Sequence, residues 1–189
     1  MGWILLIAGL LIWSVAHLFR AFAPNARAQL YDRLGPAARG LIGAIIIASV
    51  ILMVLGYRAT PFITVWSPPP FLTHVNNLLM IFAFYVYLLT ATKPGAAFVM
   101  GSTKNPQLTG FKIWAVAHLL VNGDLAAILL FGGLLAWAVV QVVKIKRLPQ
   151  TVDRETAPIT SPIVHLAVSL AVVGVVMGLH YWIGVTPWG

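Results

Sequence analysis

The sequence contains no cysteine and very few acidic residues. Its 189 residues include only four Asp and Glu, against twelve Lys and Arg. The absence of cysteine excludes disulfide bonds, thiolate metal ligands and a cysteine nucleophile. Charged residues of both signs make up 8% of the chain, so no segment is polar enough to form a soluble catalytic domain.

Apolar residues take the place of the missing charge. Hydrophobic residues make up 60% of the chain, which is more than a soluble domain of this length can bury. Most of the chain must therefore face lipid. We expect an all-α fold, a polytopic transmembrane helical bundle, and a single integral membrane domain over residues 1–189.

Six apolar segments divide the chain. They lie near residues 3–22, 40–57, 71–92, 108–121, 124–143 and 163–183. Because a helix needs about 20 residues to cross about 30 Å of hydrocarbon, most of these segments are long enough to span a membrane. The fourth is short, and we expect it to be tilted, partly buried in protein, or re-entrant.

The basic residues predict how these segments are oriented. If the N-terminus lies outside the cytoplasm, eleven of the twelve Lys and Arg fall on the cytoplasmic side, and only Arg58 lies outside. Since Lys and Arg concentrate in cytoplasmic loops, we expect both termini outside. The bases lie in short connections that meet lipid headgroups, so membrane lipid is the expected partner and nucleic acid is not.

Small residues at four-residue spacing predict places where helices approach closely. We expect these positions to pack within the chain rather than against a second copy. They are Gly40, Ala44 and Ala48 in one segment, and Gly174 and Gly178 in another.

One ten-residue pattern occurs twice, at residues 9–18 and 110–119. Both copies fit G-x-x-I-W-x-V-A-H-L, and each places one histidine, His17 or His118, inside an apolar run. In the expected topology, the two helices that carry the pattern run in opposite directions. Ionisable side chains at such depth usually face a cavity, a partner or a cofactor.

Each of these histidines follows a tryptophan by four residues, so Trp13 and Trp114 share a helix face with His17 and His118. Two neutral imidazoles on opposed helices, flanked by flat aromatic rings, suit bis-axial ligation of a b-type haem, which needs no covalent attachment. We therefore expect the two histidines to be metal ligands and the two tryptophans to contact the cofactor. The alternative is that each imidazole only hydrogen-bonds a neighbouring helix.

The fourth segment ends in polar residues. Asn122 lies four residues after His118 and is a candidate for a supporting role at the cofactor. Gly123 is expected to stop this helix and Asp124 to cap the next, although a supporting role for Asp124 stays open. We expect water and headgroups to satisfy the three remaining histidines, which are His74, His165 and His180.

Three stretches are similar to those of a known family. They are LTGFKIWAVAHLLVNGDLAAILLFGG at Leu108–Gly133, the early His17 with Arg20, and WSPPPFLTHV before the third segment. On these stretches the chain resembles the NnrU family over nearly its whole length. NnrU proteins are bacterial membrane proteins associated with nitrite and nitric oxide reduction. They are similar to plant zeta-carotene isomerase (Z-ISO), a haem b enzyme that moves a carotenoid double bond from cis to trans.

The resemblance implies haem b as the cofactor, because the positions that match the two axial histidines of the isomerase are His17 and His118. It also implies a bacterial inner (cytoplasmic) membrane. The implied function is a role in denitrification or a carotenoid isomerase-like activity, with a hydrophobic polyene substrate or a respiratory redox partner. The alternative is a non-enzymatic accessory protein for nitrogen-oxide reductases.

The chain departs from the family at one motif. Where relatives have R-H-P-x-x-x-G, residues 104–110 read KNPQLTG, so Asn105 replaces the histidine. Asparagine still forms hydrogen bonds, but it cannot shuttle protons near neutral pH. This substitution argues against isomerase turnover and leaves haem ligation by the other two histidines untouched.

The same motif also resembles the cofactor site of membrane isoprenylcysteine methyltransferases, which reads R-H-P-x-Y-x-G. Here both the histidine and the aromatic residue are missing, with Asn105 and Leu108 in their places. The only nearby acidic candidates for holding the amino-acid part of S-adenosylmethionine are Asp153 and Glu155. We therefore regard a methyltransferase as the weaker alternative.

The expected orientation can be tested with reporter proteins. A reporter that is active only in the cytoplasm should be inactive when fused after Gly189, because eleven of twelve bases place that end outside. The same reporter inserted after Arg33 should be active. Cytoplasmic activity at Gly189 would contradict the topology.

Overall fold

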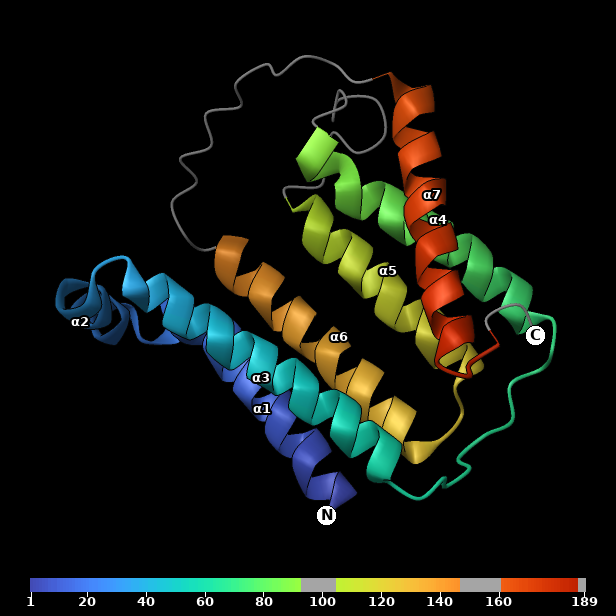
Figure 1. Cartoon of the computed structure of the whole chain (residues 1–189), viewed down its shortest axis with the longest axis horizontal. Helices are drawn as coiled ribbons and strands as arrows, with labels where there is room; N and C mark the ends of the chain where they lie inside the picture. Colours follow the sequence, from blue (N-terminus) through green and yellow to red (C-terminus); the bar gives the residue numbers. More distant parts are fainter. Residues whose placement is uncertain (93–104, 147–160, 187–189) are drawn as a thin grey trace. The chain divides into compact units, whose positions relative to one another are not determined.

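The computed structural model describes residues 1–92, 105–146 and 161–186. These residues form helices and no β-strand, apart from an isolated bridge between Thr64 and Asp124. The helices, shown in Figure 1, are α1 (Gly2–Phe22), α2 (Pro24–Leu34), α3 (Ala37–Ala59), α4 (Leu72–Thr92), α5 (Pro106–Val121), α6 (Leu125–Lys146) and α7 (Pro162–Trp182). The all-α expectation is confirmed.

Five of the described helices, α1, α3, α4, α6 and α7, are long and apolar enough to cross a membrane. They coincide with five of the six predicted segments, and the short fourth segment is α5, which has 16 residues. The chain is thus a multi-pass helical membrane protein.

Helix α2 was not predicted. It begins with Pro24 in its first turn and ends before Gly35, whose φ of 55° lies in the left-handed region that glycine tolerates. None of its residues is buried. Its polar surface includes Arg27, whose guanidinium carbon lies 4.7 Å from the centre of the Tyr31 ring. The basic connection after α1 is therefore a helix rather than a loop.

The described helices belong to two compact units. Unit 1 comprises residues 1–65 and 124–148 and contains α1, α2, α3 and α6. Unit 2 comprises residues 66–123 and 149–189 and contains α4, α5 and α7. Each copy of the repeated pattern lies in a different unit, on α1 in unit 1 and on α5 in unit 2.

In unit 1, α1 and α3 run antiparallel and lie side by side along their length (Figure 1). The contact is close because glycines line it. A methyl group added at Gly9 would lie 2.7 Å from Cγ of Met53, and one at Gly2 would lie 2.5 Å from the carbonyl of Ala59. Helix α6 packs on α1 in the parallel sense, with Gly133 beside Leu10.

In unit 2, α4 and α5 form the corresponding antiparallel pair (Figure 1). A methyl group added at Gly110 would lie 2.5 Å from the carbonyl oxygen of Ala83. Helix α7 packs on α4 through His165, whose Nε2 donates to the carbonyl of Tyr85 at 2.8 Å. The expectation that water and headgroups satisfy His165 is wrong, because its side chain is fully buried against α4.

The small-residue spacing identified the wrong contacts. Gly40, Gly174 and Gly178 have no atom within 4 Å of an added methyl group, so within the described structure they do not mark close helix packing. The glycines that do include Gly9 and Gly110, the first residue of each copy of the repeated pattern. The pattern therefore specifies helix contacts as well as histidines.

The close contacts predict opposite effects of the same substitution. Gly9→Ala and Gly110→Ala should each destabilise the protein by about 1–3 kcal/mol, because the helices must separate. Gly132→Ala and Gly174→Ala should keep or slightly raise stability, since both sites are open and alanine favours helix. Thermal unfolding in detergent, followed by circular dichroism, measures the difference. Equal melting temperatures for all four variants would contradict the packing.

Candidate functional site

Helix α1 carries Gly9, Trp13 and His17 on three successive turns. Gly9 holds the helix against α3, and Nδ1 of His17 lies 2.9 Å from the carbonyl oxygen of Trp13. A carbonyl oxygen only accepts hydrogen bonds, so Nδ1 must carry the proton. The other ring nitrogen, Nε2, is then left as a lone-pair donor, and it makes no hydrogen bond to a described residue.

Two indole rings surround the His17 imidazole. The ring of Trp13 lies 4.1 Å away, centre to centre, and the ring of Trp137 from α6 lies 4.8 Å away. The two indoles also contact each other edge to face, at 5.2 Å. Trp137 is only 7% exposed. His17 is thus held in one orientation by the hydrogen bond at its Nδ1 and by the aromatic rings around it.

We did not predict Trp137 as a neighbour of His17, although a sequence pattern points to it. Residues 133–137 repeat the G-x-x-x-W spacing of residues 9–13 and 110–114, without the rest of the pattern. Four residues after Trp137, where the other copies have histidine, stands Gln141. Its Oε1 is buried and has no hydrogen-bond partner in the described part of the chain.

Helix α5 reproduces the arrangement in unit 2. Nδ1 of His118 lies 2.9 Å from the carbonyl oxygen of Trp114, and the imidazole and indole rings lie 4.9 Å apart. Nδ1 of His118 therefore carries its proton, as in His17. The expected pairing of each histidine with its tryptophan is confirmed in both units.

The hydrogen bond alone does not distinguish these histidines. Nδ1 of His180 lies 2.8 Å from the carbonyl of Val176 on the previous turn of α7, so a helical histidine makes this bond without a tryptophan. The contact with an indole ring is what His17 and His118 share. His74, near the start of α4, is exposed, as expected.

The polar end of α5 organises the helix terminus. Nδ2 of Asn122 donates to the backbone carbonyl of His118 at 2.8 Å. Asp124 caps α6 as expected, with its Oδ1 accepting from the amide of Ala127 at 3.0 Å. Gly123 does not take the positive φ of a helix-stop glycine. A side chain there would instead collide with the carbonyl of Trp66, which explains the glycine.

The predicted site residues divide between the two units. Trp13 and His17 lie together in unit 1, and Trp114, His118 and Asn122 lie together in unit 2. That both histidines bind one iron stays a prediction. Within the described ranges, no group of three or more His, Asp or Glu residues could hold a metal ion.

Asn105 lies at the start of α5, with Pro106 following in the first turn. Its backbone carbonyl accepts a hydrogen bond from Oγ1 of Thr109 at 3.2 Å. Asn105 therefore sits at a helix N-terminus. Lys104, Asp153 and Glu155 lie outside the described residues.

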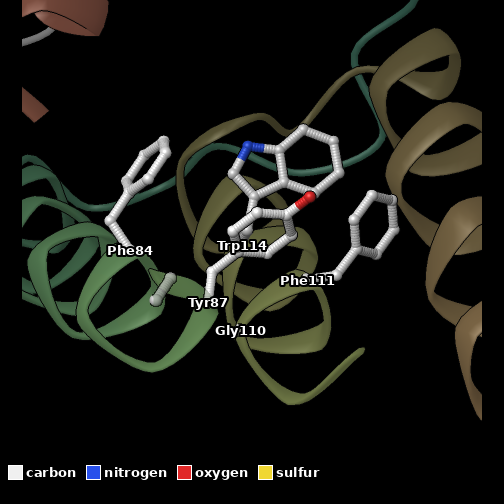
Figure 2. A pocket seen from close by; sticks show the side chains of 6 residues that line it. Phe84, Tyr87, Gly110, Phe111 and Trp114 are labelled. Atoms are coloured by element: carbon white, nitrogen blue, oxygen red, sulfur yellow. The ribbon is translucent and has the colours of Figure 1, made fainter. Parts of the chain in front are cut away.

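A cleft of about 230 Å³ opens between α4 and α5 in unit 2 (Figure 2). Trp114 lines it, together with Ala83, Phe84, Tyr87, Gly110 and Phe111. Aromatic rings dominate the lining of this cleft. Neither candidate ligand histidine lines it.

The comparisons with known proteins give one match. A family model described as "NnrU protein" matches residues 5–187, nearly the full chain. No curated protein and no solved structure matches the chain.

The hydrogen bonds predict the tautomer of each buried histidine. In haem-free protein above pH 7.5, His17 and His118 should carry the ring proton on Nδ1, whereas His165 should carry it on Nε2. Ring nitrogen shifts from solid-state NMR of ¹⁵N-histidine-labelled protein distinguish the two forms. Single His→Gln variants assign the signals. An Nε2–H signal from His17 or His118 would contradict the arrangement.

Proposed function

The chain belongs to the NnrU family, and we propose that it is a haem b-binding membrane protein whose axial ligands are His17 and His118. The observation that carries this proposal is the shared arrangement of the two imidazoles, each with Nδ1 bonded to a backbone carbonyl and with an indole ring against it. Both have Nδ1 engaged with a backbone carbonyl. This is the tautomer that a haem ligand needs, since iron binds the unprotonated Nε2 and a carbonyl commonly holds the other ring nitrogen.

The surroundings of the histidines fit a flat, apolar macrocycle. Each imidazole lies against an indole ring, and Trp137 closes a second side of His17. These rings fix the imidazole planes. Gln141, whose buried Oε1 has no partner in the described structure, offers a polar contact one turn beyond Trp137. Unsatisfied buried oxygens are rare in native proteins and often mark a site whose partner is not present.

A haem held by two imidazoles would supply one-electron transfer. His17 and His118 would hold it by donating their lone pairs, and Trp13 and Trp114 would pack beside it. Asn122 fixes the carbonyl of His118 at the end of α5 and so steadies that ligand.

Within this class, we propose an electron-transfer or accessory role in nitrite and nitric oxide reduction, in a bacterial inner membrane with both termini outside the cytoplasm. The observation that favours it over carotenoid isomerisation is Asn105, which stands at the start of α5 where the family resemblance implies a titratable histidine. The methyltransferase alternative depends on Asp153 and Glu155, which lie outside the described residues.

Absorption spectra of the purified protein test the proposal. The wild type should show the spectrum of a haem with two imidazole ligands, and His17→Ala and His118→Ala should each abolish it. His74→Ala is the control, because the side chain of His74 is exposed near the start of α4, and its spectrum should be unchanged. A wild-type protein that takes up no haem would refute the proposal, and an unchanged spectrum in either variant would exclude that histidine.

A further inference from the structure

One end of unit 1 carries basic side chains from every helix of the unit. In the antiparallel pair α1 and α3, Gly9 lies against Met53. Carried along the two helices, this register places Arg20, in the last turn of α1, within about one turn of Arg39, near the start of α3. Both arginines are exposed. Two neighbouring helices therefore present a guanidinium group at nearly the same level.

Helices α6 and α2 add further bases at this end. Nζ of Lys144, near the end of α6, lies 4.2 Å from the centre of the ring of Phe22, the last residue of α1. Helix α2 starts two residues after Phe22, lies beyond the ends of α1 and α3 (Figure 1), and carries two more arginines. We call the five bases the basic end of unit 1; they are Arg20, Arg27, Arg33, Arg39 and Lys144.

The basic end has almost no acidic counterpart. Asp32 is the only acidic residue in residues 1–65. The guanidinium groups of Arg20, Arg33 and Arg39 form no ion pair or hydrogen bond with another residue in the described part of the chain. Each guanidinium offers five N–H donors. These donors, and an excess of positive charge, are therefore available to an anion from outside the unit.

The position of the basic end along α1 matches the headgroup layer of a membrane. Helix α1 is a candidate membrane span and carries no Lys, Arg, Asp or Glu before Arg20. From Gly2 to Arg20 it is about 27 Å long at about 1.5 Å per residue, close to the ~30 Å of a bilayer's hydrocarbon core. With this length inside the hydrocarbon, Arg20 reaches the headgroups. Helix α2, none of whose residues is buried, then lies among them.

Charge determines which headgroup fits. A guanidinium binds the oxygens of a phosphate group through two parallel N–H donors. A zwitterionic headgroup also carries an ammonium group, which the arginines repel and which only Asp32 could receive. A headgroup whose only charge is its phosphate avoids this repulsion. We propose that the basic end of unit 1 binds the headgroup phosphate of an anionic phospholipid of the phosphatidylglycerol type.

The apolar surface beside the bases fits a lipid better than a free phosphate ion. Phe22 lies under Lys144 and is 59% exposed, so its ring can contact the acyl chains next to a bound headgroup. Leu34, at the end of α2, is also exposed. Haem takes no part in this site, and lipid binding can therefore be measured in haem-free protein.

Lipid preference can be measured on haem-free, full-length protein in dodecyl maltoside. The protein is mixed with equal amounts of phosphatidylglycerol and phosphatidylcholine that carry the same acyl chains, and native mass spectrometry counts the lipids that stay bound. The wild type should retain phosphatidylglycerol in preference to phosphatidylcholine by about tenfold or more. Arg33→Gln and Arg39→Gln should each lower this preference by about three- to fivefold, the contribution of one basic side chain near a membrane surface.

Arg58→Gln is the matched control. Arg58 is also an exposed arginine of α3, but it lies at the opposite end of that helix from Arg39. The variant removes the same charge from the chain, and its lipid preference should equal that of the wild type. Circular dichroism should show the same helix content in all three variants, because each of the substituted side chains is exposed.

Three outcomes would overturn the proposal. Equal retention of the two lipids by the wild type would show that the protein does not select the charge of the headgroup. The same loss of preference in Arg58→Gln as in Arg33→Gln and Arg39→Gln, or no loss in any variant, would show that the basic end is not the site. Displacement of phosphatidylglycerol by an equal concentration of inorganic phosphate would assign the arginines to a soluble anion.

Discussion

In each unit two antiparallel helices touch through a glycine that has no room for a methyl group, Gly9 against α3 and Gly110 against α4. The spacing of the other residues in the repeated pattern follows from this contact. One turn after the glycine the helices still lie close, so a large side chain cannot enter the interface and must emerge beside it, as Trp13 and Trp114 do. The next turn brings His17 or His118 beneath that indole. The spacing of glycine, tryptophan and histidine is thus the spacing of successive helical turns.

A second constraint comes from lipid, which offers polar side chains no hydrogen bonds. Most polar groups here bond a carbonyl three or four residues earlier on their own helix, as Ser49, Ser169 and His180 do. Histidine can do so only through Nδ1, and this leaves Nε2 for another partner. His165 instead uses Nε2 to bond α4 across a helix contact. The same side chain therefore serves as a structural link in α7 and as a candidate ligand in α1 and α5.

Much of the fold could be predicted from residues whose contacts lie within a few positions in sequence. Apolar length identified five spans and the short α5, and the cap formed by Asp124 depends on neighbours within four residues. Helix α2 was missed because its polar residues lack an apolar face. Trp137 and the burial of His165 were missed because both depend on residues more than 70 positions away in sequence. The small-residue spacing failed for the same reason: which glycine faces a partner is decided by tertiary packing.

The third glycine–tryptophan pair shows which residues of the repeated pattern serve helix packing. Gly133 and Trp137 of α6 repeat the spacing, and Gly133 lies beside Leu10 of α1, so the pair serves helix contact without any histidine. Packing alone therefore explains the glycines and the tryptophans but gives no reason for an imidazole on the following turn. If the residue on that turn only had to form its own hydrogen bonds in lipid, serine would suffice. Its hydroxyl bonds a carbonyl of the preceding turn, and it buries less polar surface than an imidazole. The two histidines are the part of the pattern that packing leaves unexplained, and the proposed ligation of haem would account for them.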